Sequence, residues 1–274
     1  MRHILAFFIG TIFILGTVPV EANYFRQRES DVDSNVFRIL EKDFMGVQFD
    51  QDLELIDQNG AQLKVGDFAG KPLVLVWSYY SCDGSCSAVN AELKLLLEQV
   101  DRQTIGENYR VLTLSFDKND TVETIKEFRS FLQLPPKWEK AWTFAVLKDP
   151  QKIEEMTKKT GFKFFWAPQD KTFYHPNVFI LLSPDGRITR YIYALTNNEK
   201  DMGLALLEAR KGDFKVNEVI DFVVGLCYSY NYKEGRYTYN IPLYVGLGAL
   251  FIGLSLLFSS VLLFRKKKLK EGTQ

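Results

Sequence analysis

The chain has 274 residues, and its 34 lysines and arginines balance its 34 aspartates and glutamates. The basic residues are dispersed, apart from one cluster near the C-terminus, which argues against nucleic acid or an electrostatically steered partner. Three cysteines are too few for a disulfide scaffold. The sequence also lacks a glycine-rich phosphate loop and a Ser-His-Asp arrangement, which argues against most hydrolases and nucleotide-binding enzymes.

The N-terminal residues have the pattern of a secretory signal. Arg2 precedes an apolar stretch over residues 4–18, and Ala22 ends a short segment suited to cleavage. We expect a signal peptide over residues 1–22, with an uncleaved membrane anchor as the alternative. Residues 23–47 are polar and charged, and they are expected to pack as an N-terminal arm.

The next segments predict a hairpin, a buried strand and a helix. Apolar and polar residues alternate over 53–65 around an Asn-Gly turn at residues 59 and 60, which is typical of a β-hairpin. Residues 72–79 form a continuous apolar run, as expected for a strand buried on both faces. Residues 87–100 have apolar positions at helical spacing.

Strands and helices continue to alternate along the chain. Strands are predicted over residues 109–116 and 141–147. A helix over 122–132 would have Asp120 or Thr121 as its N-cap, and a second helix over 151–160 would end at Gly161.

The last part of this region predicts a second hairpin, with strands over 178–182 and 188–193, and then a helix over 202–210. The alternation of strands and helices, with hairpins at the start and near the end, predicts an α/β domain with a mixed sheet.

A second apolar segment lies near the C-terminus. Residues 241–264 contain no charge and are long enough to cross a bilayer, and five basic residues follow within 265–270. Because basic residues stay on the cytoplasmic side, we predict a cytoplasmic tail over 265–274 and a folded domain outside the cytoplasm. Residues 213–240 would form a juxtamembrane extension, and its tyrosines would lie at the membrane interface.

The candidate chemistry lies in Cys82, Cys86 and His175. The two thiols are four positions apart, so they can face the same way at the start of a helix. His3 falls in the predicted signal peptide, which leaves His175 as the expected imidazole of the mature protein. Two thiolates and an imidazole suit Cu(I). The same thiols could instead form a reversible or a static disulfide, and the residues alone leave these alternatives open.

The sequence resembles the Sco/SenC family of thioredoxin-like copper proteins over residues 48–211. The resemblance depends on Tyr80-Ser-Cys82 with Cys86, on the turn from Ser115 to Thr121, and on His175 immediately before a strand. Two features depart from the family. Asp83 and Ser87 stand where family members usually have proline, and the aspartates of the turn are one residue closer together.

The resemblance implies a thioredoxin-like domain over residues 48–212, with a mixed sheet flanked by helices, an N-terminal hairpin and a C-terminal transmembrane helix. It implies that Cys82, Cys86 and His175 bind one copper ion, as Cu(I) or Cu(II). The implied function is a copper metallochaperone for the binuclear copper centre of cytochrome c oxidase. Implied partners are the copper-bearing oxidase subunit, other copper chaperones and thiol reductants. The expected location is the inner membrane, with the domain on the periplasmic side.

Two further functions remain open. One is a thiol-disulfide oxidoreductase that reduces client cysteines through Cys82 and Cys86, which is the only reading that makes the protein an enzyme. The other is a non-catalytic assembly or sensor protein. Because redox-active thioredoxin-like proteins carry a cis-proline that faces the cysteines, we predict a cis peptide bond before Pro176.

Other residues have less certain chemistry. The resemblance implies that Asp117 and Asp120 support the site or dock a partner, although Asp120 could be a plain helix cap. Cys227 is interpreted as an idle or buried thiol, with a copper-linked role as the alternative. The aromatic segments 164–166 and 173–174 flank His175 and predict either a hydrophobic docking surface or the packing of a long loop.

Overall fold

The computed structural model describes residues 38–81, 85–194, 196–210, 228–231 and 234–271. The predicted signal peptide and most of the predicted N-terminal arm lie outside these residues, as do Cys82 and Cys227. The backbone of residues 85–87 is described as helix, but their side chains are not.

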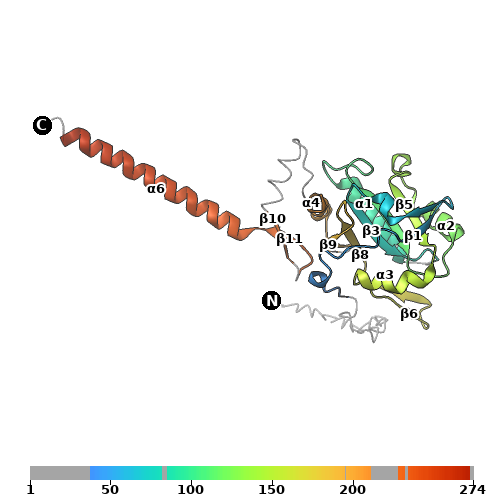
Figure 1. The fold of residues 1–274 in the computed structure, drawn as a ribbon. Helices are drawn as coiled ribbons and strands as arrows, with labels where there is room; N and C mark the ends of the chain where they lie inside the picture. Colours follow the sequence, from blue (N-terminus) through green and yellow to red (C-terminus); the bar gives the residue numbers. More distant parts are fainter. Residues whose placement is uncertain (1–37, 82–84, 195, 211–227, 232–233, 272–274) are drawn as a thin grey trace, which may run out of the picture. The chain divides into compact units, whose positions relative to one another are not determined.

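A mixed sheet forms the centre of the described domain (Figure 1). Its strand order is β2-β1-β5-β4-β3-β8-β9, in which β3, β4 and β5 are parallel and the remaining pairs are antiparallel. The strands are β1 (Glu54–Asp57), β2 (Gln62–Lys64), β3 (Leu73–Ser78), β4 (Arg110–Ser115), β5 (Trp142–Leu147), β8 (Val178–Leu182) and β9 (Ile188–Tyr193).

Helices and two small hairpins complete the described chain. The helices are α1 (Ser85–Gln99), α2 (Val122–Leu132), α3 (Ile153–Lys159), α4 (Glu199–Ala209) and α6 (Ile241–Glu271). Short 3-10 turns occur at Glu41–Asp43, Val65–Phe68, Pro136–Trp138 and Pro150–Lys152. The hairpins pair β6 (Phe165–Ala167) with β7 (Thr172–Tyr174), and β10 (Tyr228–Asn231) with β11 (Arg236–Tyr239).

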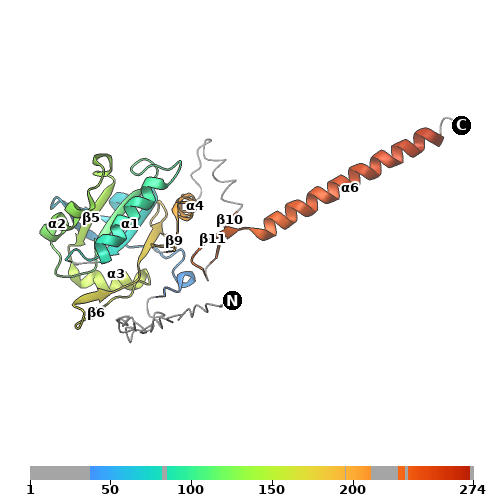
Figure 2. The ribbon, with the colours of Figure 1, turned by 180° about the vertical axis from the view of Figure 1, so that it is seen from behind.

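The central strand β3 shows how the two faces of the sheet are covered. Successive side chains of a strand point to opposite faces. Ser78 accepts a hydrogen bond from the Asn90 amide of α1, at 3.3 Å. The Trp77 indole donates instead to the Thr160 hydroxyl just after α3, at 3.0 Å. Helix α1, which contacts α2 and α4, therefore covers one face (Figure 2), and α3 packs on the other.

The topology brings three segments to one edge of the sheet. The carboxyl ends of parallel β3 and β4 lie at the same edge, with Ser78 paired to Ser115. Strand β8 is antiparallel to β3, so its amino end lies at that edge too. Val76 pairs with Phe179, and the same register continued beyond the strands brings His175 level with Tyr80. The chain that leads into Cys82, the turn after β4 and His175 therefore converge.

The predicted α/β domain and its N-terminal hairpin are confirmed. The bounds of α2, β8 and β9 are those predicted. Helix α1 begins two residues earlier than predicted, at Ser85. The segment predicted as one helix over 151–160 starts as a 3-10 turn because Pro150 and the Asp149 cap fix its first turn. The β6–β7 hairpin was not predicted.

The juxtamembrane hairpin is bonded to α4 of the domain. The backbone N–H of Tyr237 donates to Asp201 at 2.9 Å, and the Tyr237 hydroxyl donates to Glu208 at 2.7 Å. Glu208 also forms an ion pair with the guanidinium of Arg190, a buried residue of β9. These bonds attach the hairpin to α4; the predicted extension over 213–240 lies largely outside the described residues and stays a prediction.

The C-terminal helix has the length and composition predicted for a membrane span. Within α6, Ile241–Phe264 is an exposed apolar segment of 24 residues, which is long enough to cross a membrane. Close to its start, the Tyr239 ring contacts the rings of Tyr228 and Tyr244, with centroids 5.2 Å and 6.1 Å apart. This tyrosine group is of the type found at membrane interfaces.

Candidate metal centre

His175 is partly buried against aromatic rings. It lies between β7 and β8, and its ring centroid is 5.3 Å from that of Phe116, 5.8 Å from Phe162 and 6.2 Å from Tyr79. Phe116, Phe162 and Tyr79 are themselves buried. We call these three rings the aromatic wall. The wall restricts the position and orientation of the imidazole.

A hydrogen bond indicates which imidazole nitrogen can bind a metal. Nδ1 of His175 lies 3.1 Å from the carbonyl oxygen of Pro176. Because a carbonyl only accepts, Nδ1 carries the proton in this bond, and the lone pair of the neutral ring is on Nε2. A ligating histidine commonly has its second nitrogen fixed in this way. The contact therefore favours Nε2 as the ligand atom.

The prediction of a cis bond before Pro176 is wrong. No cis peptide bond occurs among the described residues, which include both His175 and Pro176. The trans form of an X-Pro bond is favoured by about 0.5–1 kcal/mol unless its surroundings require the cis form. Pro176 is buried, and its carbonyl oxygen lies 3.1 Å from Nδ1 of His175.

The segment that leads into Cys82 is held by Asp120. This carboxylate accepts the backbone N–H of Tyr80 at 2.7 Å and the hydroxyl of Ser81 at 3.0 Å. It also accepts the hydroxyl of Ser115, the last residue of β4, at 2.5 Å. One buried side chain therefore ties the end of β3 to the end of β4, directly before Cys82.

Asp120 is not the N-cap that the sequence allowed it to be. Thr121 caps α2, because its hydroxyl accepts the backbone N–H groups of Glu123 and Thr124. Asp120 instead points back toward β3 and β4 and is only 7% exposed. Burial raises the pKa of Asp120, although the hydrogen bonds from Ser115, Tyr80 and Ser81 favour its charged form.

The first half of α1 is fixed to the same two strands. Asn90 donates to Ser78 of β3 and accepts the hydroxyl of Thr113 of β4 at 2.9 Å. Tyr80, just after β3, is held to the sheet separately, because its hydroxyl lies 2.8 Å from the carbonyl of Thr113 in β4 and 2.9 Å from that of Ala145 in β5. The backbone of Cys86 lies in the first turn of α1 and is thus anchored at this edge.

The cysteine sulfurs lie outside what the structure describes. Cys82 follows Ser81 directly, and Cys86 is placed by its backbone only. Among the described side chains, no group of three or more His, Cys, Asp or Glu could hold a metal ion. The described part of the site is therefore His175 and the two anchored ends of the cysteine loop. The predicted ligand role of Cys82, Cys86 and His175 stays a prediction.

Asp117 lies on the turn after β4, where its backbone, but not its carboxylate, is hydrogen-bonded to Ser115 and Asp120 of the site. Its Oδ1 accepts both the backbone N–H and the side-chain amide of Asn119, each at 2.9 Å. Asp117 and Asn119 both line a hollow beside the aromatic wall. The structure thus gives the two aspartates different positions, one buried at the cysteine loop and one on the surface turn.

Sequence reasoning did not identify the aromatic wall. Tyr79 and Phe116 are the last residues of two predicted strands and directly follow β3 and β4, whose carboxyl ends parallel pairing places side by side. This position at the ends of two parallel strands was the feature of the sequence that could have identified the two rings. The β6–β7 hairpin supports the wall, because Phe173 contacts Tyr79 and Phe116 with centroids 5.1 Å and 5.5 Å apart. The Tyr79 hydroxyl also hydrogen-bonds that of Thr172, at 2.6 Å.

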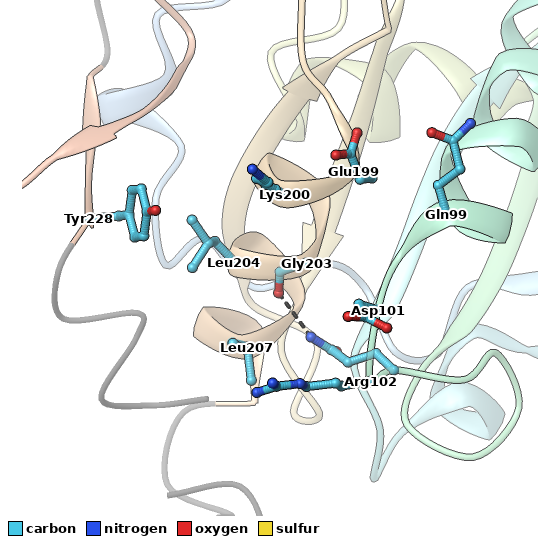
Figure 3. Close-up of a pocket in the computed structure, with 10 residues that line it drawn as sticks. Gln99, Asp101, Arg102, Glu199, Lys200, Gly203, Leu204, Leu207 and Tyr228 are labelled. Atoms are coloured by element: carbon cyan, nitrogen blue, oxygen red, sulfur yellow. Dashed lines mark hydrogen bonds between the residues drawn. The ribbon is translucent and has the colours of Figure 1, made fainter. Parts of the chain in front are cut away.

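A second hollow, of about 410 Å³, lies between the loop after α1 and helix α4 (Figure 3). Gln103 spans it and donates to the carbonyl of Gly203 at 2.9 Å, the bond drawn in that figure. Leu204, Leu207 and Tyr228 line its far side. None of its lining residues belongs to the surroundings of His175.

Comparisons with known proteins identify the family. Residues 43–205, more than half of the chain, match the model of the SCO1/SenC family. The chain belongs to the SCO1/SenC family. This SCO1/SenC match includes β3, α1, the turn after β4 and His175, which are the elements that form the described site.

The related proteins agree with this assignment. A candidate copper-binding protein of Stutzerimonas stutzeri is 23% identical over 145 residues, which cover 52% of this chain and 68% of that protein. The structure of a candidate electron transfer protein of Aquifex aeolicus VF5 is 28% identical, with a TM-score of 0.55, and the match covers 61% of this chain and 94% of that protein.

A third comparison bears on the fold alone. The structure of BsSco is 18% identical, with a TM-score of 0.51, and covers 61% of this chain and 97% of that one. BsSco is described as a member of the Sco family of cytochrome c oxidase assembly proteins, and a disulfide switch has been identified in it. The likeness confirms the predicted thioredoxin-like arrangement of the domain.

Proposed function

We propose that this SCO1/SenC protein is a membrane-anchored copper metallochaperone. It binds one copper ion through Cys82, Cys86 and His175 and helps to assemble the binuclear copper centre of cytochrome c oxidase. The observation that carries the proposal is the position of His175. Its ring, with Nδ1 lying 3.1 Å from the Pro176 carbonyl, lies at the sheet edge where Asp120 holds the residues that lead into Cys82.

The expected ligands suit copper cargo in two oxidation states. Thiolates are soft ligands that favour Cu(I), and the imidazole helps to hold Cu(II). Cys86 lies in the first turn of α1, where the helix dipole stabilises a thiolate. Copper would pass to the oxidase subunit by ligand exchange, in which partner ligands replace these ligands one at a time. Both cysteines must be reduced for this, because a disulfide sulfur is a poor ligand.

Family membership and the C-terminal helix support the proposal. The Stutzerimonas stutzeri relative bears a copper-binding name, and BsSco belongs to a family of oxidase assembly proteins. The apolar segment of α6 is followed by basic residues, which favours a cytoplasmic tail. The domain would then lie outside the cytoplasm, in the periplasm, beside a membrane-bound client.

Copper titration tests this function. The reduced full-length chain in detergent should hold one Cu(I) against a competing chelator. His175→Ala should weaken Cu(I) retention at least about tenfold, which corresponds to about 1.4 kcal/mol. Tyr174→Phe is a matched control, because it removes only the hydroxyl that donates to Asp170 beside the site. Wild-type protein that loses all copper to the chelator would contradict the proposal.

Thiol-disulfide exchange is the second candidate function. The observation that favours it is the location of Cys86 at the start of a helix, because a lowered thiol pKa promotes exchange as well as metal binding. The same variants separate the two functions. A His175→Ala protein that loses copper but reduces a model disulfide at the wild-type rate would show that the redox activity does not require the metal site.

A further inference from the structure

The hollow beside the aromatic wall is an open groove of about 570 Å³. One side is formed by α3 and the turn before it, including Pro150 and Ile153. The other side is the turn Asp117–Asn119 after β4, and Phe116, Phe162 and Phe173 supply its aromatic surface. This volume is within the usual range of about 300–1,000 Å³ for ligand sites.

The groove shares its aromatic surface with His175. Phe116 and Phe162 line the groove, and the same two rings contact the imidazole with centroids 5.3 Å and 5.8 Å away. Phe173 extends the apolar surface outward. Its ring centroid lies 4.9 Å from that of Trp166, and Trp166 is 48% exposed. A segment seated in the groove would therefore be separated from His175 by a single layer of rings.

The charges around the groove favour an acidic occupant. Lys158 is paired with Glu154 at 2.6 Å, and Asp117 accepts bonds from its own turn. Lys118 and Lys163 are exposed at the groove and make no ion pair within the described part of the chain. Lys118, Lys158 and Lys163 outnumber the carboxylates of Asp117 and Glu154 in the described lining, so the groove has a net positive charge beside its aromatic surface.

We propose that this groove docks an extended segment of a partner protein, in which a carboxylate lies next to an apolar or aromatic side chain. The apolar side chain would pack on Phe116, Phe162 and Phe173, and the carboxylate would meet Lys118 or Lys163. The identification of that partner as a copper donor or acceptor rests on the proposed function. The binding itself does not, because none of these groove residues is a proposed copper ligand.

A peptide titration with the full-length chain in detergent tests the groove. The probe is a short fluorescein-labelled peptide in which glutamates alternate with phenylalanine and leucine, and binding is followed by fluorescence anisotropy. We expect the double substitution Lys118→Glu/Lys163→Glu to weaken binding at least about tenfold. Binding should also weaken as salt rises, because both lysines are exposed.

A matched pair of lysines controls for net charge. Lys137 and Lys140 are also exposed, and they lie next to the amino end of β5, at the opposite edge of the parallel strands. Lys137→Glu/Lys140→Glu changes the net charge equally and should alter binding less than about twofold. If both double variants weaken peptide binding equally, the proposal is overturned, because the loss of affinity would then depend only on the net charge of the protein.

Altered peptides test the chemistry of the occupant. A peptide with glutamine in place of glutamate should bind at least about tenfold more weakly, as should one with serine in place of the apolar residues. If the glutamine peptide binds as tightly as the glutamate peptide, the lysines take no part and the inference fails.

Copper retention is measured on the same protein samples. The Lys118→Glu/Lys163→Glu protein should retain Cu(I) as the wild type does. If this variant loses peptide binding but retains copper, the substitutions act on the groove and not on the metal site. A wild type that binds the peptide but no copper would refute the metallochaperone function and leave the groove intact.

Discussion

His175 and the segment that leads into Cys82 lie at the same edge of the sheet, but different forces hold them. The imidazole is surrounded by the buried rings of Phe116, Phe162 and Tyr79. The segment before Cys82 is held by hydrogen bonds to Asp120. Apolar packing is sensitive to side-chain volume, whereas a buried carboxylate is sensitive to charge and pH. One half of the site should therefore respond to changes in shape and the other half to changes in polarity.

Removing a ring from the aromatic wall should have the largest effect on stability. Phe116 is 1% exposed, and its ring also contacts that of Phe164 at 4.7 Å. Phe116→Ala should lower the free energy of unfolding by about 3–5 kcal/mol, because it leaves a cavity in a packed cluster. Denaturant unfolding followed by tryptophan fluorescence measures this change.

Phe131→Ala is the control for that substitution. Phe131 lies on α2 and is 77% exposed, so its truncation should change stability by less than about 0.5 kcal/mol. If the Phe116 variant were no less stable than the Phe131 variant, the wall would not hold His175 by packing.

Substitution of the buried carboxylate should have a smaller effect on stability. Asp120→Asn keeps the shape of the side chain but replaces one acceptor oxygen with a donor, opposite Tyr80, Ser81 and Ser115. The free energy of unfolding should fall by about 1–3 kcal/mol, because at least one buried donor loses its partner. Asp117→Asn, on the same turn, should cost less than about 0.5 kcal/mol. Equal losses in the two variants would mean that Asp120 does not specifically hold the cysteine loop.

The smallest effect should be a pH dependence that belongs to Asp120. Burial raises the pKa of Asp120 in the folded state above its ordinary value of 3.8, so the folded protein binds the proton more tightly than the unfolded chain. The contribution of Asp120 to stability must then fall as pH rises from the unfolded pKa through the folded pKa.

Comparing how the stability of the wild type and of Asp120→Asn depends on pH isolates the contribution of Asp120. The free energy of unfolding of the wild type minus that of Asp120→Asn should decrease with rising pH from just below pH 4 upward, and then level off. Chemical unfolding at a series of pH values measures this difference. An increase with pH would mean that the hydrogen bonds to the carboxylate outweigh its burial.

The sequence was sufficient wherever a local pattern determined the structure. The apolar run over residues 72–79 predicted a strand buried on both faces, and every residue of β3 is buried. The Asn-Gly turn predicted the β1–β2 hairpin, and the uncharged segment near the C-terminus predicted a helix long enough to cross a membrane. The position of His175 immediately before a strand also contributed to the family resemblance, which the family match confirmed.

The arrangement of the site required the tertiary structure. Asp120 and Thr121 are adjacent, and both residue types cap helices, so no local pattern could show that Asp120 turns toward Tyr80. The aromatic segments around β6 and β7 were equally compatible with a loop or a docking surface, until their packing against Phe116 and Tyr79 placed them. The cis bond predicted before Pro176 failed for the same reason, because the surroundings decide between the isomers of an X-Pro bond.

By itself, then, the sequence determined the strands of the central sheet, most of the helices and the candidate ligands, because these depend on short-range periodicity and residue chemistry. Only the tertiary structure decided which side chains hold those ligands in place. The wall around His175 and the carboxylate before Cys82 come from segments far apart in sequence. They meet only because β3 and β4 are parallel and β8 runs antiparallel to β3, which brings two carboxyl ends and one amino end to the same edge of the sheet.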